Sequence, residues 1–459
     1  MEILMTAVFV LGYLAIALEH PIKVDKAASA LLTGVLCWTI YMLFAHEVVD
    51  ISRLPQSFLT YVNELGRNFT KHELITYYVG EYQILHYLGE IASILFFLMG
   101  AMTIVELIDA YEGFSIITDR ITTKNKVKLL WVTGFLTFFL SAILDNLTTS
   151  IVMVSLLKKL IADKKERMFF AGMVVIAANA GGAWSPIGDV TTTMLWIGGQ
   201  ITAANIIKTL ILPSIVCLAI PLIYLSFTMK GNIQPVKNTE SHKKPIKESH
   251  KKIIFSLGVG GLIFVPVFKT LTHLPPYMGM LFSLGILWVV SEILNHRADQ
   301  AKHSAYKVID VLKKIDTPSV LFFLGILSAI TALESTGILH HLAVKLDEWI
   351  PNQNIVVLTI GLLSSIVDNV PLVAASMGMY NFPTDHVFWE FIAYAAGTGG
   401  SALIIGSAAG VAVMGIEKID FIWYLKKMTL LALLGYFAGA IVYIYTHHWF
   451  IIESAQVMP

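Results

Sequence analysis

Two Asp-Asn pairs, which begin at Asp145 and Asp368, each lie in the middle of a long apolar run, at 128–160 and 354–380. An ionised carboxylate deep in hydrocarbon is costly, so an acid in such a run is a candidate for a functional site. Two copies of one dipeptide in similar settings predict a single site near the middle of a bilayer, built by an internal repeat.

The composition is typical of a protein that crosses a membrane many times. Of the 459 residues, 56% are hydrophobic and only 14% are charged, which is more apolar surface than a soluble protein of this size needs. The formal net charge is zero, so nothing indicates binding to nucleic acid. Cys37 and Cys217 lie in apolar runs and are interpreted as packing residues rather than as a disulfide or a metal site. No cofactor is expected.

Ten apolar windows are long enough to cross a bilayer. They are residues 3–19, 27–44, 85–108, 168–197, 205–229, 253–271, 276–294, 317–338, 387–416 and 425–447. The predicted fold class is therefore an all-α polytopic membrane protein.

The two runs that contain the Asp-Asn pairs do not fit a simple crossing. Each is about 30 residues long, too long for one untilted helix and too short for two crossings with a turn. We predict re-entrant hairpins over about 129–160 and 354–382, in which two helices enter from one side of the membrane and return to it. Non-helical backbone at that depth is tolerated where protein or a water-filled cavity surrounds it. The alternative is a single long tilted helix with an acid inside it.

Basic residues predict how the chain is threaded, because cytoplasmic loops carry an excess of Lys and Arg. All the clusters lie in the cytoplasm if both termini are outside, the first hairpin opens to the cytoplasm and the second opens outward. The clusters are Lys23 with Lys26, Arg120 to Lys128, Lys158 to Arg167, Lys230 to Lys252, Arg297 to Lys314, and Lys418 to Lys427. The polar segment 230–252 is predicted to be a flexible cytoplasmic linker. Short interfacial helices are expected in the outer segment 45–84.

Two halves, 1–229 and 253–459, align with each other at three ordered blocks. The aligned blocks begin at Glu90 and Asp316, at Ser141 and Ser364, and at Gly181 and Gly399. The Asp-Asn pairs coincide in the second block. Each half contains five crossings and one hairpin, and an odd number of crossings places the second half upside down relative to the first. The sequence therefore predicts an inverted-topology repeat, which is far more common among secondary transporters than among enzymes.

Glycines interrupt the crossing that follows each hairpin, in residues 177–193 and 395–410. Glycine and proline disfavour a continuous helix, and a break offers carbonyl oxygens and a negative helix end that suit a bare cation. We predict discontinuous helices over about 168–197 and 387–416, with the breaks at the midplane. The alternative is close helix packing through small residues.

The candidate ligands at the hairpin tips and breaks are oxygen atoms. They are the carboxylates of Asp145, Asp189 and Asp368, the amides of Asn146, Asn179 and Asn369, and the hydroxyls of Thr148, Thr191, Thr192, Ser364, Ser401 and Ser407. Such donors suit small hard cations, and the lack of Cys and His among them argues against a transition metal. Na⁺ is expected at the two Asp-Asn pairs, on Asp145, Asn146, Asp368 and Asn369.

The same acids suggest how a cation and a proton would be coupled. Burial raises the pKa of a carboxyl group, so a proton and a metal cation can compete for one oxygen site, and alternating exposure of that site gives antiport. Glu90 and Asp316, which the repeat aligns, are candidates for ligands, proton carriers or interfacial anchors. Acids nearer the ends of crossings are expected to be solvated, namely Glu106, Asp109, Glu334 and Glu390.

The hairpin tips, the run ANAGGAWSPIGDVTT (178–192) and the run GTGGSALIIGSAAG (397–410) resemble the NhaD-type sodium/proton antiporters of the ion transporter superfamily. The resemblance extends over about residues 85–415. It implies export of Na⁺ and Li⁺ in exchange for H⁺, favoured at alkaline pH, in a bacterial inner membrane. It also implies a homodimer in which the hairpins and broken helices move past a rigid scaffold, as in an elevator.

Other functions fit the pattern less well. Related carboxylate carriers bear Ser-Asn-Thr at their hairpin tips, whereas the acids Asp145 and Asp368 disfavour a dicarboxylate; an arsenite exporter on the same fold is a further alternative. Intramembrane aspartyl proteases need a Gly-x-Gly-Asp run, but Pro186 stands at the first glycine position before Asp189, and Val367 precedes Asp368. We therefore expect no enzyme. A channel is less natural, because two hairpins of opposite orientation suit alternating access.

Overall fold

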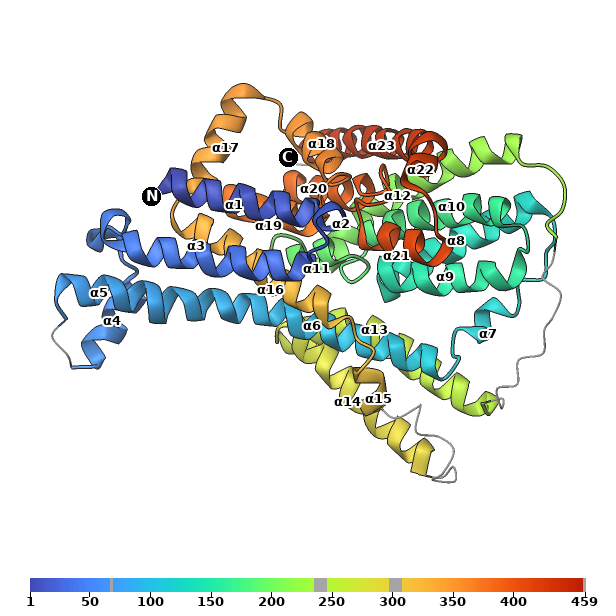
Figure 1. The fold of residues 1–459 in the computed structure, drawn as a ribbon, viewed down its shortest axis with the longest axis horizontal. Coiled ribbons are helices and arrows are strands. Elements are labelled where there is room, and N and C mark those ends of the chain that lie inside the picture. The colour runs from blue at the N-terminus through green and yellow to red at the C-terminus, as the bar shows by residue number, and fades with distance from the viewer. Residues whose placement is uncertain (67–68, 235–245, 297–307, 457–459) are drawn as a thin grey trace. The chain divides into compact units, whose positions relative to one another are not determined.

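The computed structural model describes residues 1–66, 69–234, 246–296 and 308–456, and its regular secondary structure there is helical (Figure 1). Eight helices in these stretches are long and apolar enough to cross a membrane. They lie at Lys26–Val48, Lys71–Ala110, Lys126–Leu144, Ala203–Thr228, Glu248–Thr272, Pro276–Asn295, Thr317–Ser335 and Thr429–Thr446. The predicted all-α polytopic membrane fold is therefore confirmed.

The other three predicted crossings correspond to shorter helices. The window 3–19 is the single helix α1 (Glu2–Ala17). The windows 168–197 and 387–416 are each divided into two helices, as their glycines predicted.

The chain divides into two compact units. Unit 1 comprises Met1–Leu95, Asp316–Pro351 and Ala374–Asn381, and unit 2 comprises Phe96–Ile315, Asn352–Val373 and Phe382–Pro459. The division does not follow the aligned halves of the sequence, because each half supplies helices to both units.

In unit 1, α3 packs against α1 and α16. The helices are α1, α2 (Glu19–Ile22), α3 (Lys26–Val48), α16 (Thr317–Ser335) and α17 (Ile338–Trp349). A Cβ atom at Gly325 of α16 would lie 2.4 Å from the backbone of Ala30 in α3. The two helices therefore approach with their backbones nearly in contact, as small residues allow in membrane proteins.

The segment 45–84 of unit 1 contains the short helices that the sequence suggested. They are η1 (Ile51–Arg53), α4 (Gln56–Glu64), α5 (Lys71–Tyr77) and η2 (Tyr78–Gln83), which continues into α6 (Ile84–Ala110). Phe58 of α4 is fully buried beside Leu54 and Val62, and aromatic side chains of α5 and η2 pack against this cluster. Burial of these apolar groups holds the segment together.

Unit 2 contains both hairpin tips and both broken helices. The first hairpin is α8 (Lys126–Leu144) with α9 (Asn146–Leu160), and the second is α18 (Gln353–Leu363) with α19 (Asn369–Met379), whose last residues belong to unit 1. The broken helices are α10 (Lys164–Ala183) with α11 (Val190–Ile197), and α20 (Val387–Gly399) with α21 (Ala408–Glu417). In three of these four interruptions a side chain caps the helix that follows. Asp145 caps α9, Asp189 caps α11 and Ser407 caps α21.

The aligned positions of the two halves make the same contacts within unit 2. A Cβ atom at Gly181 would lie 2.1 Å from the carbonyl oxygen of Phe138, and one at Gly399 would lie 2.0 Å from that of Gly361. In each half the broken helix therefore packs against the first helix of its own hairpin, backbone to backbone.

The remaining helices of unit 2 are α7 (Ser115–Thr118), α12 (Ala203–Thr228), α13 (Glu248–Thr272), α14 (Pro276–His296), α15 (Val308–Leu312), α22 (Phe421–Lys427) and α23 (Thr429–Gln456). They include four that are long and apolar enough to cross a membrane, namely α12, α13, α14 and α23. Helix α12 packs against α23, and α13 packs against α14.

The predicted linker 230–252 is only partly described. Residues 235–245 lie outside the described residues, as do residues 297–307 of the predicted basic cluster Arg297 to Lys314. The beginning of the linker is held by the backbone: Ile233 N donates to Lys124 O at 2.8 Å, and Ala162 N donates to Gln234 O at 3.0 Å. Its end already belongs to α13.

Candidate functional site

The tip of the first hairpin is a single residue, Asp145, between α8 and α9. Its backbone φ is 96°, a region that strains a residue with a side chain. The carboxylate is fixed by the start of α9, since Oδ1 accepts from Thr148 N at 2.7 Å and Oδ2 accepts from Thr148 Oγ1 at 2.9 Å. A strained, capped aspartate at a predicted membrane midplane is consistent with a site that fixes an acid in one place.

Asn146 connects this tip to the first broken helix. Its Nδ2 donates to Asn179 Oδ1 at 3.0 Å in α10 and also to Asp189 Oδ2 at the start of α11. Asp189 is 2% exposed and Asn179 is fully buried. The three side chains form one buried cluster because the break between α10 and α11 leaves Asp189 beside the hairpin tip.

Asn179 also joins the two halves of the sequence. Its Nδ2 lies 2.9 Å from Ser401 Oγ, near the start of the second break, and 2.9 Å from Ser407 Oγ, at its end. Ser407 Oγ in turn caps α21 by accepting from Gly410 N at 3.1 Å. Asn179 of α10 therefore links the first hairpin tip to the second break.

The second hairpin tip approaches the same cluster. Asp189 lies within range of electrostatic interaction with both Asp145 and Asp368, and the side chain of Asn369 is a hydrogen-bond partner of Asp189. Asn369 is 5% exposed. Pro371 occupies the position that corresponds to Thr148, so the second tip has no equivalent of the Thr148 hydroxyl.

This arrangement can bind a hard cation or protons. It combines three carboxylates with amide and hydroxyl oxygens, next to the C-terminal ends of α8, α10 and α20, where the last carbonyl oxygens lack partners within the helix. Within the described parts of the chain, no three His, Cys, Asp or Glu side chains are close enough to hold one metal ion. A cation here would therefore bind to one or two carboxylates, with amide, hydroxyl and carbonyl oxygens completing its coordination.

Three of the predicted hydroxyl ligands have local roles. Thr191 Oγ1 donates to Asp189 Oδ1 at 2.6 Å, and Thr192 Oγ1 donates to the carbonyl oxygen of Asp189 at 2.9 Å, so both order the start of α11. Ser364 Oγ donates to Ala396 O at 3.0 Å. Its aligned partner Ser141 donates to Ala178 O in the same way, at 2.6 Å.

The two acids proposed for a proton pathway belong to unit 1, whereas the residues of this cluster belong to unit 2. Asp316 is exposed and caps α16, with Oδ1 accepting from Ser319 N at 3.2 Å. The Glu90 side chain is 60% exposed and lies 3.4 Å from the Nε2 atom of His86.

The expectation that Glu390 is solvated was wrong. Glu390 is 2% exposed, and its carboxylate accepts from Asn205 Nδ2 and, at 2.9 Å, from Tyr443 OH. Hydropathy shows how far an acid lies from the ends of its own helix. It does not show that neighbouring helices supply hydrogen-bond donors, as α12 and α23 do for Glu390 of α20.

The comparisons with known proteins agree with this architecture. The model of the family described as "Citrate transporter" matches residues 3–390. The chain is 46% identical to "Sodium/proton antiporter 1" of Arabidopsis thaliana, over 97% of this chain and 73% of that protein. It is 29% identical to "Na(+)/H(+) antiporter NhaD" of Alkalimonas amylolytica, over 96% of this chain and 89% of that protein.

A solved structure shares the fold. The crystal structure of the YdaH transporter of Alcanivorax borkumensis matches with a TM-score of 0.56 at 12% identity, over 91% of this chain and 97% of that one. Such a distant likeness supports the polytopic fold alone. Taken together with the sequence matches, these findings mean that the chain belongs to the Citrate transporter family and, within it, to the NhaD-type sodium/proton antiporters.

Proposed function

We propose that the protein exchanges Na⁺, and also Li⁺, for H⁺ across the membrane. The cluster around Asp189 supports this proposal, because it brings the buried Asp189 of the first helix break together with the half-buried acids Asp145 and Asp368 of the hairpin tips and with amide oxygens. The curated relatives named as sodium/proton antiporters cover nearly the whole chain. Burial makes each acid a shared binding place for a proton or a cation, so the arrival of one expels the other.

The mechanism follows from alternating exposure of this site. On one side of the membrane protons leave the acids and Na⁺ binds between Asp145, Asn146, Asp368 and Asn369, with Asp189 beside them. On the other side protons return and Na⁺ leaves. We propose that the part of the chain that carries the hairpin tips and broken helices moves as an elevator, and that the protein is a homodimer in a lipid bilayer.

Everted membrane vesicles test the exchange directly. With a preformed pH gradient, addition of Na⁺ or Li⁺ should dissipate the gradient, and K⁺ serves as the comparison cation. The absence of a response to both Na⁺ and Li⁺ would refute the proposal. The family description "Citrate transporter" makes citrate a second candidate substrate. The acids of the site would repel its carboxylates, so radiolabelled citrate is expected not to enter the vesicles.

Replacement of the amide ligands should weaken cation binding. Asn146→Ala and Asn369→Ala are expected to raise the apparent KM for Na⁺ about tenfold, which corresponds to about 1.4 kcal/mol. The effect of Asn146→Ala should be the larger, because its amide also holds Asn179 and Asp189. The measurement is the Na⁺ dependence of proton movement in vesicles. An unchanged KM in either variant would show that the replaced side chain is not a ligand.

Location and orientation are also proposals. We propose a bacterial inner membrane, with both termini outside and the basic loops in the cytoplasm. Single cysteines at Lys128 and Trp349 should then react with an impermeant maleimide from opposite faces. Cys37 and Cys217 are buried, so replacing them by Ser gives a low background. Labelling of both positions from the same face would contradict the inverted threading.

A further inference from the structure

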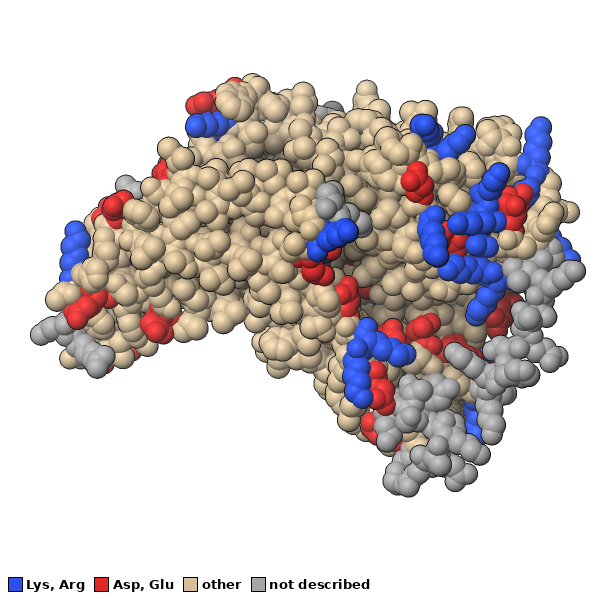
Figure 2. Space-filling view, viewed as in Figure 1, with Lys and Arg blue, Asp and Glu red and all other residues tan. Residues whose placement is uncertain are grey.

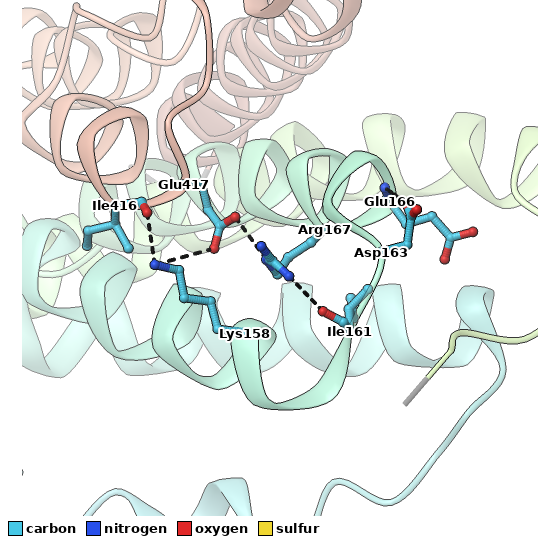
Figure 3. Close-up of polar contacts among 7 residues, drawn as sticks. All are labelled: Lys158, Ile161, Asp163, Glu166, Arg167, Ile416 and Glu417. Atoms are coloured by element: carbon cyan, nitrogen blue, oxygen red, sulfur yellow. Dashed lines mark hydrogen bonds and ion pairs between the residues drawn. The ribbon is translucent and has the colours of Figure 1, made fainter. Parts of the chain in front are cut away.

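Glu417 is a buried carboxylate at the last residue of α21, far along this helix from the site. Figure 3 shows it between Lys158 and Arg167. Its side chain is fully buried. Arg167, in the first turn of α10, donates from Nε to Glu417 Oε2 at 2.9 Å, and Lys158, in the last turn of α9, has Nζ 4.0 Å from Oε1. A buried carboxylate depends on such partners, because removing them leaves an uncompensated charge.

Two backbone contacts extend the ion pair into a clamp. Lys158 Nζ donates to Ile416 O at 2.9 Å, at the end of α21 where a cation also complements the helix dipole. Arg167 Nη1 donates to Ile161 O at 2.8 Å, at the end of α9. Lys158, Arg167 and Glu417, here called the basic-end clamp, therefore tie three helices together. The clamp belongs to the part of unit 2 where Lys and Arg gather over the ends of α9 and α10 (Figure 2).

The same three helices form the site at their other ends. Helix α9 begins at Asn146, α21 is capped by Ser407, and α10 carries Asn179. Ten to twelve residues separate each of these from the clamp residue on its own helix, about 15–18 Å of helix. A displacement at the clamp is therefore transmitted by rigid helices to the hydrogen bonds of Asn179.

The opposite ends of the broken helices are joined by hydrogen bonds. Asp385, just before α20, accepts from Thr202 N at 2.6 Å and from Thr202 Oγ1 at 2.8 Å, and Thr384 Oγ1 donates to Gly199 O at 2.7 Å. The alignment of the halves pairs Asp385 with Arg167 and Gly199 with Glu417. The repeat thus places a tie at both ends of the two broken helices, and at the basic end this tie contains the ion pair of Arg167 with Glu417.

We infer that Glu417 is a positioning residue that, through Arg167 and Lys158, sets the Na⁺ affinity of the site. This inference rests on the proposed Na⁺/H⁺ exchange. Binding constellations must be held to within about 0.5 Å, and the contact between Asn179 and Ser407 is a hydrogen bond of 2.9 Å. With the clamp open, α21 is free to shift along α9 and α10, and Ser407 moves away from Asn179. Glu417 does not touch the cation, so affinity falls more than the maximal rate.

The test compares E417Q, the charge swap R167E/E417R and the control E166Q. Glu166 forms an ion pair with Lys126 at the same end of α10, but this pair joins α10 to α8 and leaves α21 untouched. Two quantities are measured for each: hydrogen exchange of the backbone amides of α21 in the purified full-length protein, and the Na⁺ dependence of proton movement in vesicles. We expect E417Q to exchange faster in α21 and to raise the apparent KM for Na⁺ about tenfold at a nearly unchanged maximal rate. The swap should recover part of both effects, and E166Q should behave as the wild type.

Each outcome decides a separate point. Unchanged exchange in α21 of E417Q would show that the clamp does not hold this helix. Faster exchange with an unchanged KM would overturn the positioning role. If E417Q does not fold, the swap R167E/E417R decides. Recovery of both the fold and the Na⁺ affinity in the swap supports the clamp. A wild-type Na⁺ affinity in the swap, without recovered protection of α21 from hydrogen exchange, overturns it. Failure of the proposed function would instead appear in the wild type, as proton movement that does not respond to Na⁺.

Discussion

Replacement of Asp189 by Asn is expected to abolish Na⁺-driven proton movement while the protein remains folded. Asp189 is buried between the two hairpin tips, where Asn146 donates to it and Asn369 is a partner. A neutral amide can neither release a proton nor balance the charge of a cation. The fold should persist, because Asn is as good a helix N-cap as Asp, and Asp189 caps α11. Na⁺-driven proton flux in vesicles measures the activity. The expression level and the elution profile in size-exclusion chromatography report whether the variant is folded.

Asp145→Asn and Asp368→Asn should have the same effect, since each removes one of the acids that interact with Asp189. The matched control is Asp163→Asn. Asp163 caps α10 by accepting from Glu166 N at 2.8 Å, so it is also a helix cap, but it lies at the basic end away from the site. Full activity of any one site variant would remove that acid from the mechanism, and loss of activity in Asp163→Asn would indicate a general sensitivity to changed caps.

The internal repeat made the positions of the breaks and tips predictable from the sequence. Hydropathy and glycine placement located the hairpin at 129–160 and the broken helix at 168–197, and the structure interrupts these segments at Asp145 and between Ala183 and Val190. These features are local: a helix ends where capping residues and glycines favour its end. Such signals can be read from a few neighbouring residues.

The site itself depends on contacts between distant residues, and these were less predictable. The sequence assigned Na⁺ to the two Asp-Asn pairs and offered Asp189 and Asn179 as further ligands. The structure shows that Asn146 donates to both of these side chains and that Asp189 also interacts with the second tip. The repeat gives no hint of this, because Asp189 aligns with Ser407 and Asn179 aligns with Gly397. The two halves share one backbone plan but contribute different side chains to it.

Buried charges at helix ends were missed for a related reason. Glu417 and Arg167 are 250 residues apart in the sequence, and each lies in a region rich in Lys, where a solvated charge is the normal expectation. Only the antiparallel arrangement of α10 and α21, which brings the start of one beside the end of the other, makes them partners. The inverted repeat implies this arrangement, but the identities of the paired residues come from the structure.

The shared backbone plan leads to a second strong prediction. Gly181→Ala and Gly399→Ala should each destabilise the protein severely and to a similar extent. The added Cβ would lie 2.1 Å from Phe138 O in the first case and 2.0 Å from Gly361 O in the second. Overpacking typically costs about 1–3 kcal/mol, and a clash with backbone should reach the upper end of this range because no side chain can move aside. Thermal unfolding in detergent, measured as the apparent Tm, reports the effect.

Gly285→Ala in α14 is the matched control, because an added Cβ there meets nothing within 4 Å. The better helix propensity of Ala should leave its Tm equal to or above that of the wild type. If only one of Gly181→Ala and Gly399→Ala lowers the Tm, the two hairpins do not pack equally closely against their broken helices. If neither does, the close approach itself is wrong. A similar loss in both would mean that the two halves depend on the same backbone contact to hold their hairpin tips at the breaks.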